Sequence, residues 1–331
     1  MNKPFLLRPA AKDYLWGGTR LNDEFAKNID VTPLAETWEC STHPDGVSVV
    51  ASGNYTGMPL DELIAKHTDW LGTHPLATYE DCSKGQLPVL IKFIDAAKDL
   101  SVQVHPTDEY AFAHENGKLG KTEMWYVLDA KKDAGLVYGL KHTVSTDDVK
   151  EALETGSLEK YLQRIPVEKN DVFMIESGTI HAIGAGVLVA EIQENSNLTY
   201  RIYDYDRVDG KGKKRELHVD KALEVANLHS MKEPKQPLRV LQYKQGMARE
   251  LLNRCKYFEV YRMIINTERR QLVTFKSDEL SFRVLLCVNG CGTISFENEI
   301  IEVYKGDCIF VPADSVEMRL HGQIQFIDVR S

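Results

Sequence analysis

Short apolar runs, many alternating with polar residues, recur along most of the chain and predict a fold made mainly of β-strands. Residues 198–206 alternate aromatic and polar side chains, as a half-buried strand does. Helical signals are few and short. Residues 58–67 begin with Pro59 and acidic residues, and another helix is expected to start at a capping Thr146. Further predicted strands cover residues 34–39, 46–50, 87–96, 172–175 and 187–192; residues 218–227 predict a helix, and residues 110–114 a helix or loop.

A proline-containing segment at residues 234–237 predicts a linker, after which the pattern is almost entirely that of strands. We therefore expect two domains, residues 1–233 and 238–331. Within the second domain, turns are expected at Asn289-Gly290, Glu297-Asn298 and Lys305-Gly306-Asp307.

Two distant segments repeat one layout. Residues 170–181 and 306–317 each combine a tight turn, a short apolar strand, a second turn and a side chain expected to point back at the sheet. The first copy ends in His181. The second ends in Glu317 and has no His-rich strand upstream. This repeat suggests two β-barrels of one kind, of which only the first binds a metal.

Composition and charge narrow the class of protein. A chain of 331 residues with a net charge of -9 lacks the basic surface needed for non-specific nucleic-acid binding. No apolar stretch is long enough to cross a bilayer, so no membrane partner is expected. Six cysteines without a CxxC pair predict free thiols and a cytoplasmic location. A monomer is the default expectation.

Four side chains carry the strongest chemical signal. Gln103 and His105 lie two apart, so on a strand both point to the same face. Glu123 opens another predicted strand, and His181 follows a turn after a third. Imidazole, carboxylate and amide oxygen together suit a divalent cation such as zinc. Each residue alone would be interpreted as structural; their arrangement predicts a metal site.

The segment 170–181 also resembles the second signature of the cupin superfamily, with Asn170 and Glu176 replacing that signature's glycine and proline. Residues 100–106, Leu-Ser-Val-Gln-Val-His-Pro, closely resemble a motif of the type I mannose-6-phosphate isomerases, a family of zinc cupins. Further similar segments occur in the family's order, and the tail fits its C-terminal barrel in length and pattern. These segments are residues 14–18, 121–123, 178–182 and 200–207.

The resemblance implies a mainly β fold of two cupin-like, double-sheet β-barrels of jelly-roll type with a few short helices. Residues 1–233 would form the metal-binding catalytic domain, and residues 238–331 a barrel without metal ligands. One Zn²⁺ per chain would be held by Gln103, His105, Glu123 and His181. Because an amide binds zinc weakly, Gln103 could instead act from outside the coordination sphere.

The resemblance also implies the remaining active-site residues. Arg201, Lys121 and Glu191 are expected to be catalytic, and Ser101, Lys121 and Arg201 to bind a small sugar phosphate. The implied reaction interconverts D-mannose 6-phosphate and D-fructose 6-phosphate by proton transfer through an enediolate, which a metal ion can stabilise as a Lewis acid. The base stays open between Glu191 and the His and Lys groups near the metal.

Two alternatives keep the same fold. Two histidines and a carboxylate also suit iron(II), so a cupin oxygenase is the second hypothesis. The third is a non-catalytic cupin that binds sugar phosphates. The basic run at residues 211–215 is either a rim that meets phosphate or a solvated loop.

Overall fold

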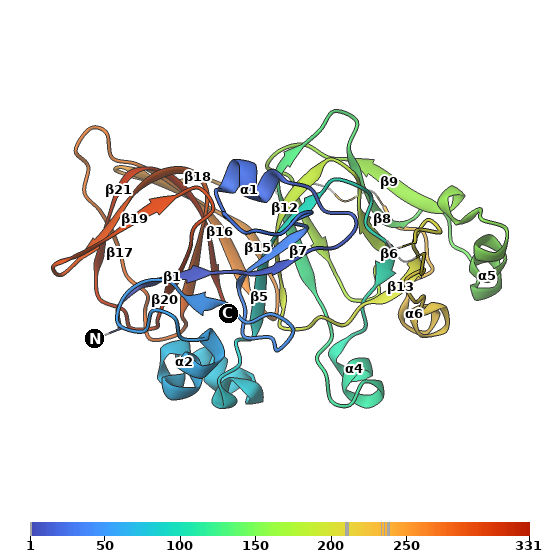
Figure 1. The fold of residues 1–331 in the computed structure, drawn as a ribbon, viewed down its shortest axis with the longest axis horizontal. Helices are drawn as coiled ribbons and strands as arrows, with labels where there is room; N and C mark the ends of the chain where they lie inside the picture. Colours follow the sequence, from blue (N-terminus) through green and yellow to red (C-terminus); the bar gives the residue numbers. More distant parts are fainter. Residues whose placement is uncertain (1, 209–211, 233, 235, 237–238) are drawn as a thin grey trace.

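The computed structural model describes residues 2–208, 212–232, 234, 236 and 239–331, and the mainly β prediction is confirmed in it. Residues 235 and 237 of the expected linker, and Lys211 of the basic run, lie outside the described part. Two lobes lie side by side (Figure 1), one built from the C-terminal strands and the other from the sheets that carry the predicted site.

The lobe that carries the predicted site contains two sheets. The first has the spatial order β10 (Val172–Ile175), β7 (Glu123–Ala130), β12 (Val187–Glu194), β5 (Val89–Ala96), β3 (Glu36–Cys40) and β2 (Ala10–Lys12). The second has the order β13 (Tyr200–Tyr203), β6 (Val102–Val104), β11 (His181–Ile183), β8 (Gly135–Leu140) and β9 (Leu162–Pro166).

The C-terminal strands form one large open sheet that also takes in two strands from the start of the chain. Its order is β14 (Gln242–Lys244), β15 (Met247–Arg254), β16 (Glu259–Asn266), β21 (Met318–Arg330), β18 (Arg283–Phe296), β20 (Cys308–Val311), β1 (Phe5–Arg8) and β4 (Val49–Val50), with β17 (Val273–Phe275) beside β21 and β19 (Glu299–Tyr304) beside β18.

Helices are short and lie outside the sheets. α5 and α6 flank the far end of the lobe that carries the predicted site (Figure 1). The helices are α1 (Arg20–Phe25), α2 (Leu60–Lys66), α3 (Thr73–Thr78), α4 (Asp108–His114), α5 (Thr146–Glu154) and α6 (Val219–Val225), with 3-10 turns η1 (Thr68–Leu71), η2 (Glu80–Lys84) and η3 (Leu158–Lys160).

Alternation along the strands assigns each face of the six-stranded sheet to a different core. On β7, Trp125 points between the two sheets and packs in one buried cluster with Leu136 and Ile183 of the five-stranded sheet. Its neighbours on the same strand, Met124 and Tyr126, pack in a second cluster that includes residues of the C-terminal sheet. Successive strand residues face opposite ways, so β7 contributes both to the site and to the contact between the lobes.

The cupin-like architecture is confirmed in its class, but the described strands do not close into complete barrels. β1 pairs antiparallel with β20, so the N-terminal residues 5–8 belong to the C-terminal sheet. The division at residues 233 and 238 remains a prediction. No helix in the described ranges is long and apolar enough to cross a membrane, and all six cysteines are unpaired, as expected.

Two local predictions need correction. The turn expected at Asn289-Gly290 is wrong, because β18 continues through it with a register shift after Cys287. The α5 cap is Ser145 rather than Thr146, since the Ser145 hydroxyl accepts from the Asp148 amide in a capping box.

The repeated layout is present in both copies, with a difference at the end. Asn170 and Gly306 open the copies at positive φ values of 75° and 105°, and each is followed by a short strand. His181 is buried, as a side chain directed back at the sheet should be. Glu317 is exposed, so the expectation that it points back at the sheet is wrong. The shared backbone layout therefore ends in a buried histidine in one copy only.

Gly306→Ala is predicted to lower the free energy of unfolding by roughly 2–4 kcal/mol, because a Cβ would lie 2.3 Å from the Phe25 carbonyl oxygen at a left-handed φ. Gly53→Ala is the matched control: φ is 78° and no atom lies within 4 Å of the added Cβ. It should cost only about 1 kcal/mol. Urea unfolding measures both, and equal losses would contradict the importance of the contact.

Candidate metal centre

Strand register places one line of side chains across the five-stranded sheet. Arg201 on β13 lies opposite Gln103 on β6, and Gln103 lies opposite His181 on β11. His181 in turn lies opposite Tyr138 on β8. Directly opposite residues share a face of a sheet. This face therefore presents a guanidinium, an amide and an imidazole on adjacent strands.

A second line crosses the six-stranded sheet. Glu191 on β12 lies opposite Trp125 on one side and Lys92 on the other, and Lys92 lies opposite Trp38. Glu123 opens β7 two residues before Trp125, so both point to the same face. Charged groups thus lie on the inner face of a sheet that is otherwise apolar.

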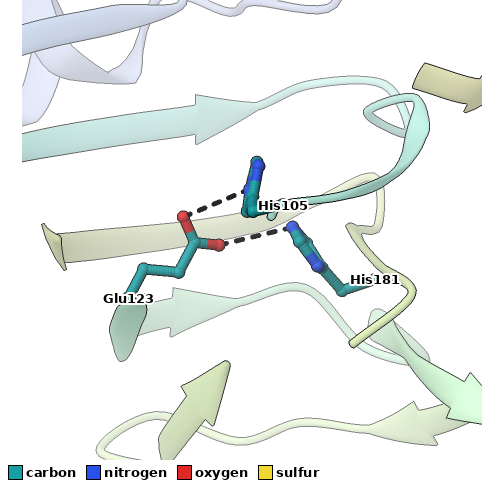
Figure 2. Close-up of side chains that lie close together, drawn as sticks. All are labelled: His105, Glu123 and His181. Atoms are coloured by element: carbon teal, nitrogen blue, oxygen red, sulfur yellow. Dashed lines mark ion pairs between the residues drawn. The ribbon is translucent and has the colours of Figure 1, made fainter. Parts of the chain in front are cut away.

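Three of the predicted ligands meet between the sheets. Glu123 Oε2 lies 3.6 Å from His105 Nε2, and Glu123 Oε1 lies 3.4 Å from His181 Nε2. One ligand atom from each residue lies within 4.8 Å of the others, and all three side chains are buried. Figure 2 shows both imidazoles directed toward the single carboxylate. The structure therefore brings these three side chains together, and their role as metal ligands stays a prediction.

Backbone carbonyls orient both imidazoles. His105 Nδ1 lies 2.9 Å from the Leu198 carbonyl oxygen, and His181 Nδ1 lies 2.8 Å from that of Thr179. A carbonyl only accepts, so Nδ1 carries the proton and Nε2 presents a lone pair toward Glu123. Burial holds the His105 pKa well below its usual value and lowers that of His181 to about 4, so both rings are neutral and suited to bind a metal.

The carboxylate of this group lacks full compensation without a cation. Burial, with the charge of Glu191, raises the pKa of Glu123 to about 7. Glu123 Oε1 is buried and has no hydrogen-bond partner among the described residues. Buried polar atoms normally have partners, and a divalent ion would supply one here. The donor set of two imidazoles and one carboxylate fits such an ion.

Gln103 lies next to this group rather than at its centre. Its amide nitrogen is placed 3.2 Å from His181 Nε2. Amide oxygen and nitrogen are assigned from the surrounding hydrogen bonds, and the flipped amide would direct its oxygen at the same point. Gln103 is therefore close enough to contribute a fourth donor.

Lys121 joins the ligands to a buried ion-pair network. Its Nζ lies 2.5 Å from Glu123 Oε2, 3.2 Å from His105 Nε2 and 3.9 Å from Glu191 Oε1. Glu191 also lies 3.0 Å from Lys92 Nζ. Burial would raise the pKa of Glu191, but the charges of Lys121 and Lys92 outweigh it and lower that pKa to about 2.

Ser101 and Arg201 form a separate pair on the five-stranded side. The Arg201 Nε donates to the Ser101 hydroxyl at 3.2 Å, and Nη1 donates to the Glu216 carbonyl at 2.9 Å. Burial and the nearby charge of Arg215 lower the pKa of Arg201. Arg215 itself pairs with Asp204. This part of the basic run is thus neutralised within its own loop.

Sequence reasoning missed three residues of the network. Lys92 contacts Glu191 and lies 3.7 Å from Glu36 Oε2, which also accepts from Trp38 Nε1 at 2.7 Å. A charged residue inside an apolar run is the signal that could have revealed Lys92, because burying a charge requires a partner.

Two stacked sheets that bring two imidazoles and a carboxylate together define a protein of the cupin class with a candidate metal site. Models of the phosphomannose isomerase type I catalytic domain and the mannose-6-phosphate isomerase cupin domain match residues 5–133 and 248–331. The mannose-6-phosphate isomerase ManA of Bacillus subtilis is 37% identical over 326 residues, covering 98% of both chains. The chain therefore belongs to the type I mannose-6-phosphate isomerase family of enzymes.

Further relatives agree with this assignment. The mannose-6-phosphate isomerase of Streptococcus mutans is 35% identical, covering 99% of this chain and 98% of its own. The crystal structure of the mannose 6-phosphate isomerase from Bacillus subtilis has a TM-score of 0.88 at 33% identity, covering 99% of both chains. A zinc-bound mannose 6-phosphate isomerase shares the fold at a TM-score of 0.74 and 16% identity, again over 99% of both.

Glu123→Gln is predicted to weaken zinc binding by more than about 100-fold, since losing the anionic ligand should exceed the 10–100-fold typical of supporting residues. Titration calorimetry with Zn²⁺ measures the affinity. Glu176→Gln, which changes an exposed carboxylate of the turn before His181, should bind zinc like the parent protein. Unchanged affinity in Glu123→Gln would show that the ion lies elsewhere.

Proposed function

We propose that this protein is a zinc-dependent isomerase that interconverts D-mannose 6-phosphate and D-fructose 6-phosphate through an enediolate. The observation that carries the proposal is the convergence of His105, Glu123 and His181 in a member of this family. Two imidazoles and a carboxylate suit zinc, and a zinc-bound isomerase has the same fold. When bound, it would act as a Lewis acid on a substrate oxygen.

Lys121 and Arg201 suit different ends of the substrate. Lys121 contacts two of the predicted ligands directly, so its ammonium can hold the oxygens of the reacting carbons as negative charge develops. Arg201 is two strands away from His181, with Gln103 between them. Neighbouring strands lie about 4.8 Å apart. That separation matches a phosphate about five bonds from the reacting carbons.

Arg201 and Ser101 therefore form the proposed phosphate site. A guanidinium with a nearby hydroxyl supplies several fixed donors to a phosphate dianion. Binding energy at the phosphate can position the reacting carbons at the metal end. The remaining candidate ligand, Gln103, lies between the two ends and can contact the metal or the sugar.

The role of Glu191 follows from its surroundings. A general base works best with a pKa near the working pH, whereas Lys121 and Lys92 hold the pKa of Glu191 at about 2. Its Oε2 also accepts from Trp125 Nε1 at 2.9 Å. Glu191 is thus a weak base. We propose that it orients Lys121 and Lys92, and that a group at the metal moves the proton.

Removal of the metal is predicted to abolish isomerisation of mannose 6-phosphate, and Zn²⁺ to restore it. Fructose 6-phosphate formation after chelation and after zinc addition measures this. Full turnover in a zinc-free preparation would overturn the mechanism. Oxygen consumption by an iron(II)-loaded preparation would instead support the oxygenase alternative.

Arg201→Ala is predicted to lower kcat/KM for mannose 6-phosphate by roughly 100-fold, because a fixed charge on the phosphate is lost. Any turnover of unphosphorylated mannose should change little, because that substrate has no phosphate for the guanidinium to bind. Arg201→Lys should recover only part of the loss, since an ammonium lacks the planar fork.

Arg164→Ala is the control for this series, because Arg164 is largely exposed on β9 and pairs with Asp99. An equal loss with mannose and mannose 6-phosphate in Arg201→Ala would place the guanidinium at the reacting carbons instead of the phosphate.

A further inference from the structure

A pair of carboxyl groups outside the metal centre joins three parts of the chain; Glu194 is buried, whereas the Asp108 side chain is 25% exposed. Glu194 ends β12, Asp108 begins α4, and the two side chains are hydrogen-bonded to each other. Two carboxyl groups can form such a bond only if one keeps a proton. The pair therefore carries one proton and one negative charge.

Glu194 holds the segment that leads into Glu123. Its Oε1 accepts from the Thr122 amide at 2.6 Å, and its own amide donates to the Thr122 carbonyl at 3.1 Å. Thr122 lies between Lys121 and Glu123. The carboxyl group of Glu194 thus supports the backbone that carries both of these side chains.

Asp108 holds the segment that follows His105. It comes three residues after that histidine, and its Oδ1 accepts from the Gly120 amide at 3.0 Å. Its Oδ2 accepts from the Tyr257 hydroxyl at 2.7 Å. Tyr257 lies between β15 and β16 of the C-terminal sheet, so the C-terminal lobe also contributes to this support.

The surroundings decide which group keeps the proton. Burial and the charge of Asp108 raise the pKa of Glu194 to about 8. Burial would raise the pKa of Asp108, but hydrogen bonds from Tyr257 and Glu194 outweigh it and lower that pKa. The other titratable groups that face the pair are Tyr79 just before η2, Cys255 and Lys256 beside Tyr257, and Glu109 of α4.

We propose that the Asp108–Glu194 pair is a positioning device that keeps the His105 and Glu123 segments together only while the two carboxyl groups share a proton. Loss of that proton would place two negative charges in contact and push the start of α4 away from β12 and Thr122. Both metal-ligand segments would then separate. Neither residue is one of the predicted ligands, and both contact the backbone beside them, so the pair would act through the ligands.

The sign of the effect is set by Glu194. Its pKa is higher in the folded protein than in the unfolded chain, so its contribution to stability is complete below about pH 4.5 and is lost as the pH rises toward about 8. Imidazole ligands behave oppositely, since deprotonation favours metal binding as the pH rises. Weaker metal retention at alkaline pH would therefore be an effect of the Asp108–Glu194 pair and not of the imidazole ligands.

The test is the rate of zinc release from the zinc-loaded full-length protein into excess chelator between pH 6.5 and 9.5. For the parent protein, we expect release to accelerate about 10–100-fold above pH 8, the range typical of losing outer support for a metal ligand. Glu194→Gln should keep the Thr122 contact and release zinc at a nearly constant rate. Asp108→Asn should also remove the acceleration, because it removes one of the two like charges.

Glu109→Gln is the matched control, since it changes an exposed carboxylate next to Asp108 and should leave the alkaline acceleration intact. The same acceleration in Glu194→Gln or in Asp108→Asn would overturn the proposal, and the two variants report independently if one fails to fold. The link to catalysis rests on the proposed function. The zinc-release measurement does not depend on the proposed function. If the isomerase assay failed, the result of the zinc-release test could still be interpreted.

Discussion

The structure depends on accommodating the carboxylate of Glu123 between two packed sheets. A buried carboxylate without compensation is strongly unfavourable, and here neutral imidazoles face it on one side and an ammonium on the other. A divalent ion would complete this balance. The strand pairings that place Glu123, His181 and Lys121 within a few ångströms of one another are therefore also what give the site its chemistry.

The same pairings separate tasks between the sheets. The five-stranded sheet presents Arg201 in line with Gln103 and His181, whereas the six-stranded sheet presents Glu191 in line with Lys92. Donors suited to an anion thus lie on the five-stranded sheet, and the buried ion pair of Glu191 and Lys92 lies on the six-stranded sheet. The opposite face of the six-stranded sheet packs toward the C-terminal sheet, so the C-terminal sheet supports the sheet that carries Glu123.

The repeated layout shows how one backbone serves two purposes. Asn170 takes the place of the expected glycine at a positive φ of 75°, a conformation that asparagine tolerates better than most residues. Its side chain also accepts from the Tyr126 hydroxyl at 2.6 Å. In the other copy, Gly306 fits against Phe25 without a side chain. Only the first copy ends in a buried histidine, His181.

The sequence by itself determined most strands, some of the short helices and the identity of the metal-ligand candidates, because alternation and the spacing of Gln103 and His105 are local properties. Only the tertiary structure decided which strands pair and in which register. It therefore brought Lys92 to Glu191, Asp108 to Glu194, and residues 5–8 to the C-terminal sheet. The continuation of β18 through Asn289-Gly290 has the same cause: pairing with neighbouring strands outweighed a local turn preference.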